Sequence, residues 1–257
     1  MLLKANNLSI EFGGLKAVQN FNLEIDENNK ELVAIIGPNG AGKTTVFNML
    51  TGIYTPTHGQ IIIQDQVMNG LRAFKFTQKG IARTFQNIRL FGSATVLENL
   101  IIAMDMQVDY TFVDALLQTK KYKAVEAKFK QQAMDLLKTL HLDSKADFPA
   151  KNLAYGEQRR LEIARALATN PKVLCLDEPA AGMNPMEVNE LITLIGEIRE
   201  KFDINIILIE HHMNMVMAIA DRIKVLDFGV TIAEGKPSEI QNNPRVIEAY
   251  LGQEEES

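Results

Sequence analysis

Short runs of apolar residues recur in the first and last parts of the chain, separated by stretches with helical spacing. Such runs are typical of buried strands, and their alternation with helices predicts a mainly parallel sheet with helices on both faces. The expected strands include residues 32–36, 61–63, 173–176, 206–209 and 223–226, with a helix around residues 46–50. The pattern therefore predicts an α/β fold.

The middle of the chain has a different pattern. From residue 97 to residue 142 no run resembles a strand, and apolar residues from Tyr122 to Leu140 recur at helical spacing with lysines between them. We expect an inserted helical subdomain whose lysines face solvent. Within a single domain of residues 1–257, the expected division is an α/β core of residues 1–86 and 152–257 and a helical subdomain of residues 87–151. The polar tail, residues 253–257, is expected to be frayed.

Composition narrows the class of protein. The 257 residues are 46% hydrophobic and carry a net charge of -5, so an electrostatic nucleic-acid binder is not supported and no nucleic-acid partner is expected. The single cysteine excludes an intramolecular disulfide framework and suits a reducing compartment. No apolar run approaches the roughly 18 residues that span a bilayer, and the N-terminus lacks a signal peptide's apolar region. We therefore expect a cytoplasmic protein that reaches a membrane only through partners.

The segment from Gly37 to Thr44 matches the phosphate-binding pattern G-x-x-x-x-G-K-[ST], between an expected strand and an expected helix. Glycines let several backbone N–H groups point at one phosphate chain, and the helix N-terminus adds about half an elementary charge. Lys43 is expected to neutralise the β and γ phosphates, and the Thr44 hydroxyl to ligate Mg²⁺. The other expected phosphate-loop contacts are Gly37, Asn39, Gly40, Ala41, Gly42 and Thr45. The pattern alone fits a kinase, a GTPase or an ATPase.

Two carboxylates, Asp177 and Glu178, directly follow the expected strand 173–176. A strand end beside a phosphate loop is where a carboxylate reaches the Mg²⁺ shell, which suits Asp177. Glu178 can then orient and deprotonate an attacking water, a step that favours hydrolysis over transfer to a small acceptor. Cys175 lies inside the same strand and is expected to be a buried, inert thiol.

Residues 153–160 read Leu-Ala-Tyr-Gly-Glu-Gln-Arg-Arg ahead of a helical stripe. This segment resembles the signature sequence of ABC-type ATPases, whose pattern is Leu-Ser-Gly-Gly-Gln, and the order of motifs matches that family over nearly the whole chain. The resemblance implies a P-loop NTPase core with an N-terminal antiparallel β part and an inserted α-helical subdomain. It also implies ATP bound between the phosphate loop of one subunit and the signature helix of a second, head-to-tail subunit.

Further roles follow from the resemblance, one residue at a time. Gln86 matches the glutamine that senses Mg²⁺, and His211 matches the histidine that contacts the γ-phosphate. Phe12 matches the aromatic that stacks on adenine, with plain core packing as the alternative, and Val18 would pack near the ribose. The signature contacts to the nucleotide would come from Ala154, Gly156 and Glu157.

The chain departs from the family pattern at several positions. Ala154 stands where serine is usual, so one hydroxyl bond to phosphate is lost, while the Gly156 amide and the helix end remain. The other departures are Tyr155 for the first glycine, Glu157 for glutamine, and Asn184 and His212 for aspartates. We interpret Arg159 and Arg160 as solvent-facing helix charges. Residues 227–229 read Asp-Phe-Gly, which we interpret as a hairpin turn because no kinase catalytic loop precedes them.

These departures, with the segment 83–91 and the ending 249–252, resemble the ATP-binding subunits of bacterial branched-chain amino-acid importers. The alternatives are the ATPase of lipopolysaccharide export, a soluble ABC-type ATPase acting on DNA or ribosomes, and a non-hydrolysing nucleotide switch. The importer resemblance implies transmembrane permease subunits docked beside Gln86 and residues 88–100. It also implies a second ATPase subunit, identical or related, and a location on the inner face of the cell membrane.

Overall fold

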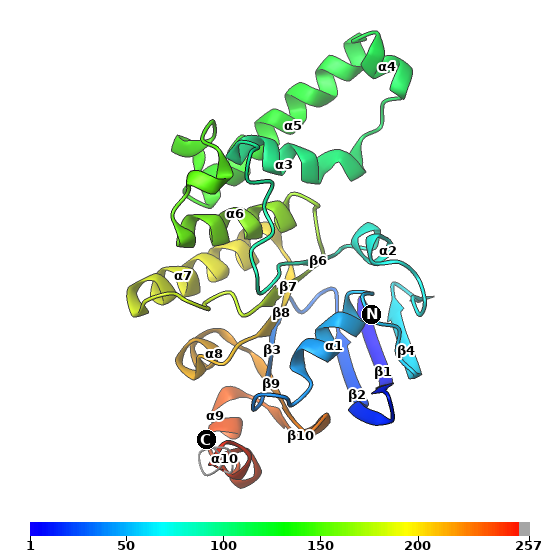
Figure 1. The fold of residues 1–257 in the computed structure, drawn as a ribbon, viewed down its shortest axis with the longest axis vertical. Helices are drawn as coiled ribbons and strands as arrows, with labels where there is room; N and C mark the ends of the chain where they lie inside the picture. The colour runs from blue at the N-terminus through cyan, green and yellow to red at the C-terminus, as the bar shows by residue number, and fades with distance from the viewer. Residues whose placement is uncertain (252–257) are drawn as a thin grey trace. The chain divides into compact units, whose positions relative to one another are not determined.

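A computed structural model describes residues 1–251, so the predictions for Gly252 and for the tail 253–257 lie outside the described residues. The chain divides into two compact units, one formed by residues 1–86 and by residues from 172 onward, and the other by residues 87–171. Figure 1 follows the chain through both units in colour. Among the described residues, no helix combines the length and the apolar character needed to cross a membrane.

The first unit contains a small antiparallel sheet with the strand order β2-β1-β4-β5, which confirms the expected antiparallel part near the N-terminus. Its strands are β1 (Leu3–Phe12), β2 (Leu15–Ile25), β4 (His58–Ile63) and β5 (Gln66–Val67). Along β1, buried residues alternate with accessible ones, as in a sheet that covers a core with one face.

A second, six-stranded sheet in the same unit has the order β10-β9-β3-β8-β7-β6. Its strands are β3 (Leu32–Ile36), β6 (Ile81–Arg83), β7 (Val173–Asp177), β8 (Asn205–Ile209), β9 (Arg222–Asp227) and β10 (Val230–Gly235). All neighbours are parallel except β9 and β10, which confirms the mainly parallel sheet. The β9–β10 hairpin turns through Phe228 and Gly229, both with positive φ, as the hairpin interpretation predicted.

Helix α1 (Lys43–Leu50) buries Val46, Phe47, Met49 and Leu50 in a core shared with strands of both sheets. This burial fixes the position of the N-terminal end of α1, which directly follows the phosphate loop. The remaining helices of this unit are α2 (Ala73–Gln78), α7 (Pro185–Phe202), α8 (Met213–Ile219), α9 (Pro237–Gln241) and α10 (Pro244–Leu251). Helix α7 buries Leu191, Leu194, Ile195 and Ile198 at helical spacing.

The second unit is helical, and its helices are α3 (Val96–Met104), α4 (Phe112–Leu116), α5 (Lys120–Thr139) and α6 (Tyr155–Leu167). Single 3₁₀ turns cover Asp105–Gln107, Asp143–Lys145 and Ala150–Asn152. Its end differs from the expected boundary between residues 151 and 152, because the unit continues to Pro171. The physical reason is that α6 packs against α3 and α5, so the helix after the signature groups with the insertion.

Two glycines with the same backbone angle test how tightly this core is packed. Gly52 and Gly70 both have φ of +73°, but a Cβ on Gly52 would lie 2.4 Å from the ring of Phe76, whereas a Cβ on Gly70 meets nothing within 4 Å. We expect Gly52→Ala to lower the free energy of unfolding by about 1–3 kcal/mol more than Gly70→Ala, since both share the strain of positive φ and one adds overpacking. Urea unfolding of both variants measures the difference, and equal losses would contradict the packing argument.

Candidate functional site

The phosphate loop connects the end of β3 to the start of α1, and its path requires glycine at two points. A Cβ on Gly37 would lie 2.0 Å from the carbonyl oxygen of Leu226, and a Cβ on Gly42 would lie 2.7 Å from that of Ala17. Gly40 also has a positive φ of 78°. Gly37 and Gly42 therefore lie where backbone approaches backbone too closely for a side chain, whereas Gly40 has open space and is favoured by its backbone angle alone.

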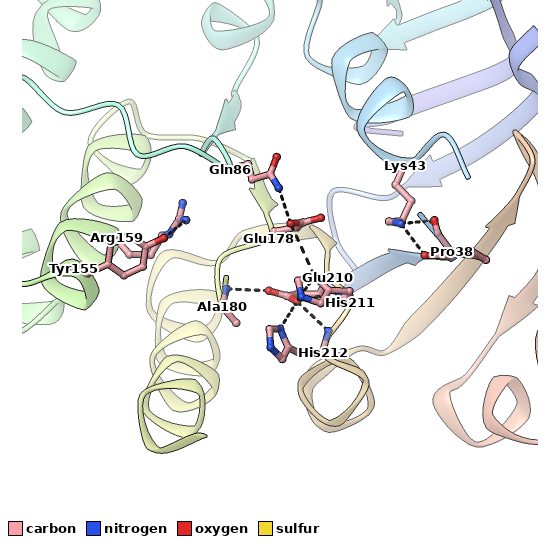
Figure 2. A network of polar contacts seen from close by, with 11 residues as sticks. Pro38, Lys43, Gln86, Tyr155, Arg159, Glu178, Ala180, Glu210, His211 and His212 are labelled. Atoms are coloured by element: carbon pink, nitrogen blue, oxygen red, sulfur yellow. Dashed lines mark hydrogen bonds and ion pairs between the residues drawn. The ribbon is translucent and has the colours of Figure 1, made fainter. Parts of the chain in front are cut away.

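Lys43, the first residue of α1, extends its side chain back into this loop (Figure 2). Its ammonium group donates hydrogen bonds to the carbonyl oxygens of Gly37 at 2.7 Å and Pro38 at 2.8 Å. Burial lowers the pKa of Lys43, and the nearby charge of Glu178 opposes that shift. The structure thus holds the expected cation inside the loop, where a phosphate chain would meet it.

A pocket of about 620 Å³ opens over the loop. It brings together most of the predicted phosphate contacts and the carboxylate of Glu178. The lining residues are Leu15, Lys16, Ala17, Gln19, Asn39, Gly40, Ala41, Gly42, Lys43, Thr44, Thr45, Glu178 and Phe228. A volume of this size suits a small-molecule ligand, and the lysine and loop amides suit an anionic one.

Two residues expected at the nucleoside end of the ligand are not among the residues that line this pocket. Phe12 is 45% exposed but is not among the lining residues, and its ring packs edge-on against Tyr54 with the centroids 5.3 Å apart. Val18 is fully buried in the core beneath Gly42. Contacts from Phe12 to adenine and from Val18 to the ribose therefore stay predictions.

Sequence reasoning missed Phe228 as a pocket residue. Its side chain is 82% exposed at the tip of the β9–β10 turn and lines the pocket. The turn is joined to the phosphate loop because the amide of Gly229 donates to the carbonyl of Ala41 at 3.0 Å. The signal available in the sequence was an aromatic residue in a two-residue hairpin turn, a position where a side chain is exposed.

Asp177 ends β7 and is buried beside Arg83, the last residue of β6. The guanidinium of Arg83 lies 2.6 Å from Oδ2 of Asp177 and also donates to Asn48 of α1 and to Thr51, the residue directly after α1. Because Oδ2 carries this ion pair, a cation would be held through Oδ1. The oxygen donors of Thr44, Asp177 and Gln86 fit a hard cation such as Mg²⁺. The sequence did not predict the part played by Arg83.

Glu178 adopts a positive φ of 45°, a strained backbone angle for a residue with a side chain, and it lines the pocket. Its Oε2 accepts a hydrogen bond from the side-chain amide of Gln86 at 2.9 Å and lies 3.9 Å from Nδ1 of His211 (Figure 2). The structure thus brings together the three residues that were expected to act around the terminal phosphate.

The signature residues lie in the second unit, at the N-terminus of α6. The backbone amide of Ala154 donates to Oε2 of Glu157 at 3.2 Å, and Lys145 lies 2.6 Å from the other oxygen of that carboxylate. The hydrogen bond from Lys145 lowers the pKa of Glu157. Glu157 therefore caps its own helix, and nucleotide contacts from Ala154, Gly156 and Glu157 stay predictions.

The interpretation of Arg159 as a solvent-facing charge is wrong. The residue is 0% exposed, and its guanidinium lies 2.9 Å from the carboxylate of Glu162, three residues later on the same helix, and 3.3 Å from the hydroxyl of Tyr155. Burial is possible because the neighbouring carboxylate compensates the charge. Arg160 is half-buried.

A phosphate loop after a parallel strand, with an acidic pair at the end of β7 in the same sheet, defines a P-loop nucleotide hydrolase. The ABC transporter family matches residues 18–181, and a family described as the branched-chain amino acid ATP-binding cassette transporter matches residues 230–256. The chain belongs to the ABC transporter family and is an ATPase of the kind that is coupled to transport.

Individual relatives agree with this assignment. The chain is 49% identical to the high-affinity branched-chain amino acid transport ATP-binding protein LivG of Escherichia coli, over 98% of each chain. It is 32% identical to the lipopolysaccharide export system ATP-binding protein LptB of Haemophilus influenzae, again over 98% of each.

Solved structures of ABC transporter cassettes share the fold. An ATP-binding cassette in its ADP conformation has a TM-score of 0.82 and 29% identity, over 98% of each chain. A dimeric structure of a bacterial ABC transporter cassette has a TM-score of 0.76 and 26% identity, over 92% of this chain and 99% of that one. The expected P-loop fold of ABC ATPases is confirmed.

The burial of Arg159 generates a stability prediction. Arg159→Ala would remove the ion-pair partner of the buried Glu162 carboxylate, which would keep the hydrogen bond from the Arg89 amide at 3.3 Å. Because a buried charge would then lose its opposite charge, we expect a loss of about 3–5 kcal/mol in the free energy of unfolding. Arg160→Ala removes the same side chain from the next, more accessible position and should cost less than about 1 kcal/mol. Denaturant unfolding measures both variants. Similar losses in the two variants would mean that the buried ion pair does not stabilise the fold more than a partly exposed arginine does.

Proposed function

We propose that this chain is the ATP-binding subunit of a branched-chain amino-acid importer and hydrolyses MgATP to ADP and phosphate. The proposal of ATP hydrolysis rests on one observation: Gln86, Glu178 and His211 lie together beside the pocket that contains Lys43. The substrate class is supported by the 49% identity to a branched-chain amino acid transport protein, against 32% to a lipopolysaccharide export protein.

In this proposal the phosphate loop binds the triphosphate. The loop amides and the N-terminus of α1 face the phosphates, and Lys43 exchanges its bonds to Gly37 and Pro38 for bonds to phosphate oxygens. Thr44, Asp177 and Gln86 would hold Mg²⁺, which supplies charge neutralisation at the phosphate oxygens. Arg83 orients Asp177 for this task through their buried ion pair.

Hydrolysis needs a base for the attacking water, and Glu178 has the position for it. Its carboxylate lies at the pocket wall and is held by the amide of Gln86. Glu178 would take the water's proton, while the exposed ring of His211 contacts the γ-phosphate. Lys43 and the loop amides stabilise the charge that develops on the leaving phosphate oxygens.

The site is completed by a second ATPase subunit, whose signature helix would face the γ-phosphate. Residues Ala154 and Gly156 open the first turn of α6, and the helix N-terminus there favours an anion. A solved dimer of a related cassette supports the pairing. We propose a head-to-tail dimer, with a related subunit favoured over an identical one in the assembled importer.

The importer would place the chain at the inner face of the cell membrane, bound to transmembrane permease subunits. Closure and reopening of the ATPase dimer would pass to the permease through the helical unit. The proposed docking region is Gln86 with residues 88–100. Support comes from the transport role in the names of the relatives.

Glu178→Gln tests the base. We expect ATP binding to persist, the dimer to accumulate with ATP, and hydrolysis to fall by about 10²-fold or more, since the amide binds water but takes no proton. Glu197→Gln removes an exposed carboxylate from α7 and should leave hydrolysis unchanged. Phosphate release and gel filtration with ATP provide the readouts. Hydrolysis at the parent rate in Glu178→Gln would show that the base assignment is wrong.

Gly156→Asp tests whether the signature acts on the nucleotide of the partner. The added carboxylate would repel the γ-phosphate of the other subunit, so hydrolysis should be lost while ATP binding by the isolated chain stays unchanged. Gly196→Asp, at a glycine of α7 with open space around it, is the matched control. Binding is measured with a fluorescent ATP analogue at low protein concentration, and hydrolysis at high concentration. Loss of binding by the isolated Gly156→Asp chain would contradict action across the dimer.

A further inference from the structure

Glu210 is a buried carboxylate that the proposed mechanism does not use. It follows the last residue of β8 and precedes His211, and its side chain is 0% exposed. A buried ionised carboxylate is stable only when donors surround it, so the donors around Glu210 indicate what it does.

Three backbone N–H groups and one ring nitrogen of His212 surround the two oxygens of Glu210 (Figure 2). Oε1 accepts from the backbone amide of Ala180 at 2.8 Å. Oε2 accepts from the backbone amides of His211 at 2.9 Å and His212 at 3.1 Å, and lies 3.0 Å from Nδ1 of His212. Each oxygen therefore serves a different segment of the chain.

The two segments carry the residues proposed to act on the terminal phosphate. Ala180 lies two residues after Glu178, in the turn that leads to α7, and its amide is held by one oxygen of Glu210. The other oxygen holds the backbone of His211, whose ring lies 3.9 Å from the carboxylate of Glu178. Hydrogen bonds to an ionised acceptor are about twice as strong as neutral ones, so this carboxylate joins the two segments firmly.

A metal site is a weaker interpretation of the same cluster. The ligand atoms of Glu210, His211 and His212 lie within 4.8 Å of one another, close enough for an ion. The oxygen of Glu210 next to the histidine rings, Oε2, already accepts from the amides of His211 and His212, so an ion bound there would compete with those donors. The hydrogen bonds therefore favour a clamp on the backbone.

We propose that Glu210 is a positioning residue for ATP hydrolysis, which sets His211 against Glu178 by holding the backbone at His211 and Ala180 together. The inference rests on the proposed roles of Glu178 and His211. It predicts that losing the clamp slows the chemical step and leaves nucleotide binding intact, because the phosphate loop and Lys43 lie outside these hydrogen bonds.

Glu210→Gln and Glu210→Ala in the full-length chain test the proposal. A glutamine has one acceptor oxygen in place of two, so it can keep the hydrogen bonds to only one of the two segments. Alanine has no acceptor and loses the hydrogen bonds to both segments. We expect kcat to fall about 10- to 100-fold, more in the alanine variant, with KM and the Kd of an ATP analogue unchanged, as for a small displacement of reacting groups. Glu31→Gln, which removes a carboxylate paired with Arg222, is the matched control and should keep the parent kcat.

Amide hydrogen exchange without nucleotide gives a readout independent of hydrolysis. The amides of Ala180, His211 and His212 should lose protection in the alanine variant, while those of β3 keep theirs. Retained protection, a parent-like kcat, or a parallel loss of Kd and melting temperature would each overturn the proposal. If the proposed base is wrong, Glu178→Gln hydrolyses ATP at the parent rate while the exchange result still reports on the clamp.

Discussion

The close approach of three backbone segments around the phosphate loop is the constraint on which the rest of the site depends. The loop passes so near the carbonyls of Leu226 and Ala17 that Gly37 and Gly42 leave no room for a Cβ. The hairpin turn closes this arrangement, because the amide of Gly229 donates to the loop and its carbonyl accepts from β2. The direction of α1, and with it the position of Lys43, follows from this packing.

Much of the fold was readable from the sequence because its signals are local. Apolar runs located the central strands of the parallel sheet, and the insertion showed helical spacing, but β6 was missed since it spans only Ile81–Arg83. The boundary at residue 152 differed because α6 follows a motif of the α/β core in sequence, yet packs with the insertion. Local patterns locate helices and strands but do not determine which neighbours an amphipathic helix packs against.

The parts of the site that the sequence did not predict are contacts between distant positions. Arg83 and Asp177 are 94 residues apart, and Glu210 and Ala180 are 30 apart, so no motif spacing connects them. Arg159 had a local partner in Glu162, but its burial depends on how α6 packs. Motifs predicted which residues would meet a phosphate, whereas the charges that position those residues became visible only in the folded chain.

Two departures in the signature, at positions 154 and 157, both affect the hydrogen bonds and charges at the N-terminus of α6. Alanine at position 154 has no hydroxyl to accept from the first-turn amides of α6, whereas the carboxylate of Glu157 still accepts from the amide of Ala154, the other bond of a capping box. A carboxylate at a helix N-terminus is favourable for the helix but would repel an incoming phosphate. Lys145 neutralises it through a short ion pair, so the cap is kept while much of the repulsion is removed. Glu157 and Lys145 therefore keep one bond of the cap without leaving an unpaired negative charge at this helix end, and the Gly156 amide can still serve an anion.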